Sequence, residues 1–502
     1  MLHPPLLVDL HGPRLDDAER ALLHHPGVAG VCLFTRNLVD LAQARALVRE
    51  LHDVAGRPLV IGIDQEGGGV VRLPALAVPP SAMALGAVDD VELTQRLGCA
   101  TGRGVKRIGV NVDFAPVADV QFNPANPVIG DRAFGADPEL VARHVAAFVR
   151  GLQDAGVAAT LKHFPGHGDV AQDSHLALPR LEANAARLAL LEFAPFAAGI
   201  AAGAAAIMTG HLLVPALDPE WPATLSGEVL EGALRAHLGF DGVLFSDALD
   251  MRAITARWDV PEAAVRASAA GVDVPVVCNA DVATYEAALA ALSAALRAGR
   301  LPDERVRLAR ARLQRLLDTY PSEAVEPDAA VLDDDAAAER DAARRAITAL
   351  GSLPRLTPGV PVALFGLSHV PSSAASDTTA PVAALVEALE RSGVPVRWAR
   401  DLDDVGPAVA GAQALLVATS ERAPLDRDAA RTYLTAFERG LAAGLPSLHV
   451  ALWNPDHVRH LPMPALLSFG FRPSSAAALA RALISGEAPG QSPVPLLALG
   501  QA

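Results

Sequence analysis

Eight short apolar runs alternate with stretches of helical periodicity through the first part of this 502-residue chain. The runs are LLVDL near residue 6, GVCLF near 30, PLVIGID near 58, VNVDFA near 110, VAATLKH near 157, AAIMTGH near 205, GVLFSDA near 242 and VDVPVVC near 272. Helices are expected at 39–54, 138–154, 186–200, 227–237, 261–270 and 281–298. Buried parallel strands are apolar throughout, and strict alternation of strand and helix builds a parallel sheet with helices outside it. The sequence therefore predicts a (β/α)8 barrel of the TIM type over residues 1–318.

The rest of the chain predicts a second, smaller domain. Residues 319–345 are assigned to an acidic, proline-containing linker that enters a bridging helix. Apolar runs then resume as VPVALFGL, VPVRWA, ALLVAT, SLHVALW and ALLSFGF, with helices expected near 380–392, 427–443 and 474–485. This alternation predicts a three-layer α/β sandwich over residues 346–502.

The charge balance limits the kinds of partner. A formal net charge of -15, without any run of Lys or Arg, argues against a nucleic-acid partner, because phosphate binding needs a basic face. No apolar run reaches the length that spans a membrane, and MLHPPLLVDLHG lacks the basic start and apolar stretch of a signal peptide. Cys32, Cys99 and Cys278 are expected to be buried thiols. These features predict a cytoplasmic protein, with a monomer favoured.

Ionisable residues crowd the loop KHFPGHGDVAQDSH at 162–175, which follows the apolar run GVAATL. Pro165, Gly166 and Gly168 stop the strand and allow a sharply bent loop. Asp173 lies two residues before His175, so its carboxylate can accept a hydrogen bond from one ring nitrogen while the other moves protons.

A zinc site is the alternative for the same loop. Its ligands would come from His163, His167, Asp169 and His175. Lys162 argues against a metal site because its ammonium group would lie beside any bound metal cation.

Polar residues also follow the ends of other predicted strands, where barrels of this type carry their active sites. They are Arg36, Asn37, Asp64, Arg132, Lys162, His163, His211 and Asp247.

The loop KHFPGHGDVAQDSH resembles the signature of glycoside hydrolase family 3, in its NagZ-type β-N-acetylhexosaminidase branch. Related motifs follow in family order: LFTRN (33–37), IDQEGG (63–68), VIGDRAFG (128–135), MTGH (208–211) and FSDALDM (245–251). One departure is GGGV, with Gly69 where the family commonly has an arginine.

The resemblance implies a role for each motif residue and no metal or organic cofactor. Asp247 is implied as the nucleophile, and Asp173 with His175 as the acid/base dyad. Sugar contacts are implied for Asp64, Arg72, Arg132, Lys162, His163 and His211. Two structural alternatives stay open: Asp247 or Asp250 could cap a helix, and Arg132 and Lys162 could only neutralise nearby carboxylates.

These observations predict a retaining exo-β-N-acetylglucosaminidase that hydrolyses terminal β-linked GlcNAc from peptidoglycan-derived muropeptides or related saccharides. A β-N-acetylglucosaminide phosphorylase is an alternative, because a neutral imidazole does not repel phosphate. A noncatalytic saccharide-binding protein is a third. The second domain is expected to pack on the barrel or partly close its cleft.

Overall fold

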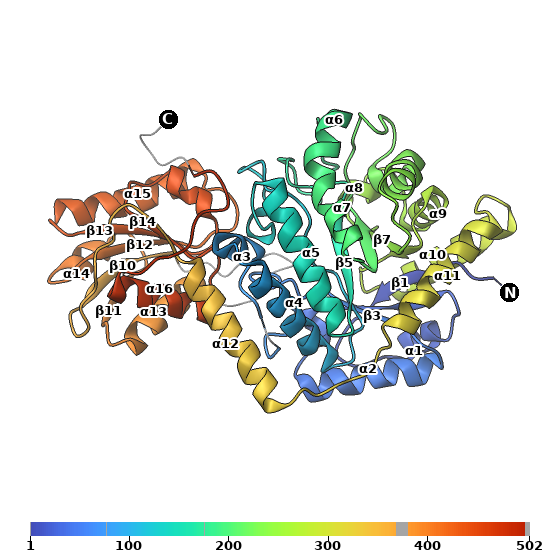
Figure 1. Cartoon of the computed structure of the whole chain (residues 1–502), viewed down its shortest axis with the longest axis horizontal. Coiled ribbons are helices and arrows are strands. Elements are labelled where there is room, and N and C mark those ends of the chain that lie inside the picture. Colours follow the sequence, from blue (N-terminus) through green and yellow to red (C-terminus); the bar gives the residue numbers. More distant parts are fainter. Residues whose placement is uncertain (1, 77, 175, 368–379, 497–502) are drawn as a thin grey trace.

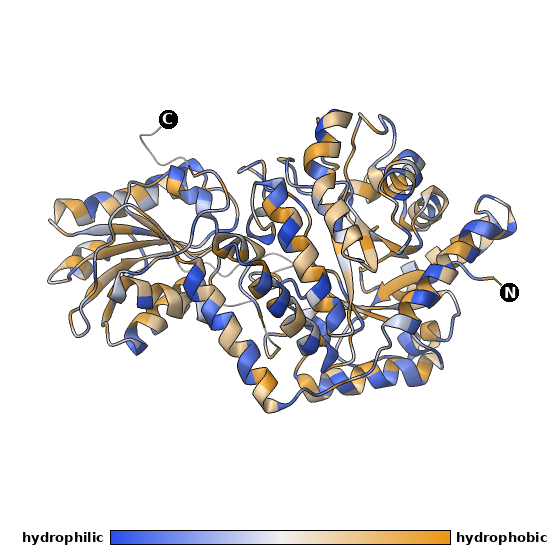
Figure 2. Cartoon of the chain, viewed as in Figure 1, coloured by the Kyte–Doolittle hydropathy of each residue, from blue (hydrophilic) through white to orange (hydrophobic). Residues whose placement is uncertain are grey.

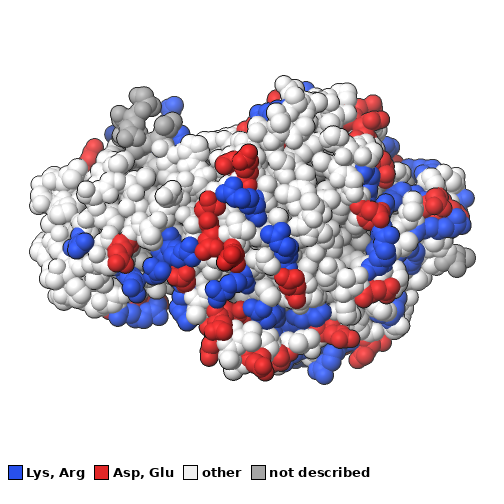
Figure 3. Space-filling model, in the orientation of Figure 1, with Lys and Arg blue, Asp and Glu red and all other residues white. Residues whose placement is uncertain are grey.

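The computed structural model describes residues 2–76, 78–174, 176–367 and 380–496. It shows two bodies joined by a long helix (Figure 1). Hydrophobic residues fill the strands of both sheets and the inner faces of the surrounding helices (Figure 2). On the face shown in Figure 3, basic and acidic side chains are interspersed. No helix in the described ranges is long and apolar enough to cross a membrane.

The first body is a closed barrel of eight parallel strands, in which β8 pairs with β1. Its strands are β1 Leu6–Asp9, β2 Val28–Leu33, β3 Val60–Ile63, β4 Val112–Asp113, β5 Ala158–Phe164, β6 Ala206–Thr209, β7 Val243–Ala248 and β8 Val274–Val276. The prediction of a (β/α)8 barrel is confirmed.

Helices surround the barrel and follow local sequence signals. For example, α2 begins after Asp40, whose carboxylate accepts from the Gln43 amide, and ends at Gly56, where φ is 64°. The helices of this body are α1 Asp17–Leu23, α2 Leu41–Ala55, α3 Ala82–Val88, α4 Val91–Lys106, α5 Pro138–Asp154, α6 Ala185–Arg187, α7 Phe193–Ala201, α8 Arg252–Thr255, α9 Val260–Ala270, α10 Val282–Arg297 and α11 Asp303–Thr319. Shorter or π-helical segments are η1 Thr35–Asn37, η2 Gly130–Arg132, η3 Leu188–Glu192, η4 Ala223–Leu225 and η5 Glu228–His237.

The second body is a six-stranded sheet in the order β11-β10-β12-β13-β14-β9, parallel except for β9. Its strands are β9 Thr348–Leu350, β10 Val362–Phe365, β11 Val396–Ala399, β12 Leu415–Thr419, β13 Ser447–Ala451 and β14 Ala465–Leu467. Its helices are α13 Pro381–Arg391, α14 Val405–Val409, α15 Arg427–Ala442, η6 Pro455–Arg459 and α16 Pro473–Ser485. Separate apolar cores lie on the two faces of the sheet, one under α13 and α16 and the other under α14 and α15. The predicted three-layer sandwich is confirmed.

Helix α12, Ala329–Ala346, lies between the two bodies (Figure 1). Ala338 and Ala342 belong to the barrel core, whereas Ala343 belongs to the core of the second sheet. Because the alanine side chain is small, helix α12 can pack closely against both cores. The domain limits at 318 and 345 stay predictions.

One smaller expectation, that all three cysteine thiols are buried, is wrong. Cys32 is buried, but Cys99 and Cys278 are partly exposed, and all three are free. The amino-terminal end of the barrel also carries a charged cluster that the sequence did not suggest. There Asp273, which precedes β8, pairs with Arg235, Arg305 and Arg312 at 2.7, 2.6 and 3.3 Å.

Candidate active site

A cavity of about 240 Å³ lies at the carboxyl ends of the barrel strands. Among its lining residues are Asp64, Arg72, Arg132, Lys162, His163 and Asp247. The structure thus brings six of the predicted site residues to one cavity, from loops and strand ends that are far apart in sequence.

Asp64 follows β3 and lies between two cations. The Lys162 Nζ is 2.8 Å from Asp64 Oδ1, and the Arg72 Nη2 is 2.9 Å from Oδ2. Burial disfavours the charged form of Asp64, but Lys162 and Arg72 outweigh burial and hold the pKa of its carboxyl well below the ordinary value. Asp64 is therefore an ionised acceptor in a fixed orientation.

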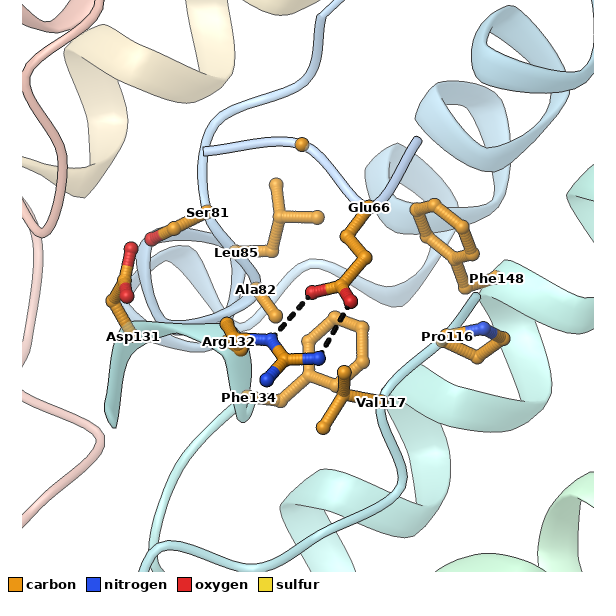
Figure 4. A pocket seen from close by; sticks show the side chains of 11 residues that line it. Glu66, Ser81, Ala82, Leu85, Pro116, Val117, Asp131, Arg132, Phe134 and Phe148 are labelled. Atoms are coloured by element: carbon orange, nitrogen blue, oxygen red, sulfur yellow. Dashed lines mark hydrogen bonds and ion pairs between the residues drawn. The ribbon is translucent and has the colours of Figure 1, made fainter. Parts of the chain in front are cut away.

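Glu66 is a second buried acid that the sequence prediction missed. It accepts two hydrogen bonds from Arg132, from Nε at 2.8 Å and from Nη2 at 2.7 Å (Figure 4), and pairs with Lys162 at 2.6 Å. Burial alone would raise the pKa of Glu66, but Arg132 and Lys162 outweigh burial and lower this pKa to about 2. The available signal was its place two residues after Asp64, in IDQEGG.

Asp119 is a further missed acid, fully buried in the connection after β4. Its Oδ2 lies 2.8 Å from His163 Nδ1, and its Oδ1 accepts the His167 amide at 2.7 Å. An imidazole that donates from Nδ1 carries its lone pair on Nε2, which lies 3.5 Å from Arg132 Nη2. Asp119 therefore orients His163 toward the cavity and Arg132.

Asp247 lies at the end of β7, is half-buried and lines the cavity. Its Oδ1 accepts the Ala248 amide at 2.8 Å. Neither alternative cap is present, because α8 starts after Met251 without a side-chain cap. Asp250 accepts the Cys278 amide at 2.7 Å instead.

The loop after β5 carries the predicted acid/base pair. Asp173 is half-buried, and Ser174 lines the cavity with its hydroxyl 3.3 Å from His167 Nε2. His175 lies outside the described residues, so the dyad stays a prediction.

Two residues of the zinc alternative, Asp169 and His163, have other partners. Asp169 pairs with Arg187 at 2.5 Å, and His163 bonds to Asp119. Burial lowers the pKa of His167 to about 4. Within the described ranges, no group of three or more His, Cys, Asp or Glu side chains is placed to hold a metal.

His211 is fully buried behind the cavity and is not among its lining residues. Its Nε2 lies 2.9 Å from the Ala248 carbonyl, and its Nδ1 lies 2.8 Å from the Thr224 hydroxyl. In this position it supports the backbone next to Asp247.

The second domain contacts the loop that carries Asp64 and Glu66. The Arg472 Nε donates to the Gly68 carbonyl at 2.7 Å. A β-carbon at Gly69 would lie only 2.7 Å from Cζ2 of Trp453. The space used by a side chain at Gly69 is thus occupied by an indole of the second domain.

A (β/α)8 barrel with ionised, hydrogen-bonding side chains around one cavity defines an enzyme that binds a polar, hydroxyl-rich ligand. Residues 6–316 match the N-terminal domain of glycosyl hydrolase family 3. The chain belongs to this family and is a glycoside hydrolase, as its motifs predicted.

Relatives with known names support this placement. The chain is 41% identical over 282 residues to a β-hexosaminidase of Thioalkalivibrio sulfidiphilus, covering 55% of this chain and 80% of the relative. A family 3 β-N-acetylglucosaminidase structure from Paenibacillus sp. FPU-7 is 35% identical, with a TM-score of 0.91 and 98% of both chains covered. NagZ from Neisseria gonorrhoeae is 29% identical with a TM-score of 0.57, covering 68% of this chain and 98% of that one.

Proposed function

We propose that this enzyme is a retaining exo-β-N-acetylglucosaminidase that releases terminal β-linked GlcNAc. The observation that carries the proposal is the position of Asp247, at a strand end on the wall of the cavity that also contains Asp64, Lys162 and Arg72. A carboxylate held in this way can attack an anomeric carbon, while the other charges hold the sugar. The names of the relatives described above agree with a β-N-acetylhexosaminidase activity.

The cavity suits a single sugar ring. Its volume of about 240 Å³ is at or below the lower end of small-molecule pockets, roughly 300–1,000 Å³. Asp64 offers acceptors, and Arg72, Arg132 and Lys162 offer donors, so that sugar hydroxyls meet fixed partners. Because a cavity of this size holds one sugar ring, we expect cleavage at the end of a saccharide chain.

The proposed reaction has two steps. First, a carboxylate oxygen of Asp247 bonds to the anomeric carbon as the glycosidic bond breaks, and the leaving oxygen takes a proton from His175. Second, His175 takes a proton from water, whose oxygen displaces Asp247 and restores the original configuration. Asp173 is proposed to orient His175 and to stabilise its charged form. No metal or organic cofactor enters either step.

The proposal extends to the biological setting. Muropeptides derived from peptidoglycan are the proposed substrates, and the enzyme is proposed to act in the cytoplasm as a monomer. Three free thiols fit a reducing compartment. Cell fractionation tests the location, and a sedimentation measurement tests the monomeric state.

The test of the reaction compares 4-nitrophenyl N-acetyl-β-glucosaminide with the matching β-glucoside, in buffers with and without phosphate. We expect hydrolysis of the first substrate only, with the β anomer appearing first in proton NMR spectra. Initial release of the α anomer would contradict retention. Formation of GlcNAc 1-phosphate that depends on phosphate would instead establish the phosphorylase.

A further inference from the structure

Arg422 comes from the second domain and reaches the edge of the active site. It follows β12 and is partly exposed. Its Nη2 donates to the carbonyl of Val128, and Val128 lines the active-site cavity. The Arg132 Nη1 donates to the same carbonyl at 3.2 Å. Two guanidinium groups from different domains therefore meet at one oxygen atom.

The charge of Arg422 is poorly balanced. Arg132 has its own bidentate partner in Glu66, but Arg422 forms no ion pair within 4.0 Å among the residues that the structure describes. Asp131, Glu66 and Asp173 act on Arg422 only from a longer range. Burial, followed by repulsion from Arg132, lowers the pKa of Arg422. Arg422 thus donates to a backbone carbonyl and has no bidentate carboxylate partner of its own in the described part of the chain, so its guanidinium can bind an added anion.

The surroundings of Arg422 indicate which side of the substrate it faces. Val128, whose carbonyl accepts from Arg422, lines the same cavity as Ser174, the residue that follows Asp173. Asp173 lies on the loop to which the proposed function assigns proton transfer at the glycosidic oxygen. If that function holds, Arg422 lies on the side of the leaving group, outside the cavity that holds the terminal sugar.

We propose that Arg422 is a specificity residue that binds a carboxylate on the leaving group, at the junction of the two domains. A guanidinium offers paired N–H donors that match the two oxygens of a carboxylate. Because the Arg422 side chain is partly exposed, a ligand can reach it from solvent. The second domain thereby selects acidic saccharides, while the barrel performs the reaction. This inference rests on the proposed function and adds a substrate preference to it.

The test uses two substrates that differ in the charge of one carboxyl group: GlcNAc-β-1,4-N-acetylmuramic acid and its methyl ester. For the wild type we expect kcat/KM to favour the acid by roughly 10- to 100-fold, as for a hydrogen bond to a charged group. Arg422→Gln should lose this preference and leave the rate on the ester unchanged. Arg422→Lys should keep part of it, because the charge stays but the paired donors are lost.

A matched control is Arg427→Gln, an exposed arginine at the start of α15 in the same domain, which should behave as the wild type. Equal wild-type rates on acid and ester would overturn the assignment, and this comparison needs no variant to fold. An equal loss on both substrates in Arg422→Gln would also overturn it, since a strut between domains acts in that way. A defect of Arg422→Gln that is confined to the formation of sugar 1-phosphate would overturn the assignment as well, because the anion bound by Arg422 would then be phosphate. Failure of the wild type to hydrolyse 4-nitrophenyl N-acetyl-β-glucosaminide would refute the proposed function itself.

Discussion

The indole of Trp453 takes the space that a side chain at Gly69 would need. A β-carbon built on Gly69 would lie 2.7 Å from Trp453 Cζ2 and 3.4 Å from Cε2. Trp453 is itself buried, 2% exposed, and packs against Phe471 with ring centroids 4.5 Å apart. The indole is thus held in place, and glycine at position 69 is a condition for the second domain to sit on the barrel loop.

Restoring the arginine that is common in the family should therefore harm this protein. We expect Gly69→Arg to lower the free energy of unfolding by about 1–3 kcal/mol or more, as overpacking does. Thermal unfolding followed by circular dichroism measures the effect. The double variant Gly69→Arg, Trp453→Ala should be more stable than the sum of the two single changes predicts. Strict additivity would show that the two residues do not compete for space.

Much of the fold could be predicted because its signals are local. Each barrel strand lies within one of the apolar runs or at its end. The predicted helices begin and end within two residues of the helical segments in the structure. Strand β9 was not predicted. Its three residues, TAL, carry no periodic pattern, and the strand exists only because its register pairs it antiparallel with β14.

The candidate site was predicted less completely, for a related reason. Asp64 follows β3 and Lys162 lies near the carboxyl end of β5, so the barrel topology alone places such motif residues together. Asp119 and Glu66 could equally have been surface acids, since their importance depends on partners that the fold brings from other strands. Trp453 was beyond prediction because its contact with Gly69 joins two domains.

The buried carboxyl of Asp113 predicts a specific dependence of stability on pH. Burial raises its pKa to about 7, although the Gln65 amide donates to it and Lys162 is near, while Asp64 and Glu66 add to the rise. Between the ordinary pKa of 3.8 and about 7, the unfolded chain loses this proton and the folded chain keeps it. The contribution of Asp113 to stability is therefore fully present below 3.8 and lost as pH rises to about 7.

Asp113→Asn removes this titration and keeps a neutral side chain of similar shape. The stability of the variant relative to the wild type should increase from about pH 4 to pH 7 and then level off. Urea unfolding at a series of pH values measures the difference. Asp53→Asn, at an exposed position of α2, is the control and should show no such trend. A constant difference across this range would mean that Asp113 is ionised in the folded protein.

The proposed nucleophile can be tested against its neighbour. Asp247→Ala should lower kcat on the order of 10⁴-fold, as loss of a residue of the catalytic unit does, with little change in thermal stability. Asp250→Asn is the matched comparison and should retain far more activity, since Asp250 accepts a backbone amide. A 5-fluoro glycosyl reagent should label Asp247 in peptide mass spectra. A label on Asp250, or more than about a hundredth of wild-type activity in Asp247→Ala, would displace the assignment.

The proposed dyad makes a prediction that separates its two tasks. An activated aryl glycoside needs little protonation of its leaving group, so His175→Ala should slow the first step less than the attack of water on the covalent intermediate. The intermediate should accumulate, as a burst of released phenol. Azide needs no general base, and its addition should restore turnover and give a glycosyl azide of retained configuration. Asp173→Asn should show a milder form of the same behaviour, because the imidazole remains while its tautomer and basicity change. Loss of activity together with a bound metal, and recovery of the chelated wild type by zinc, would instead establish the metal site.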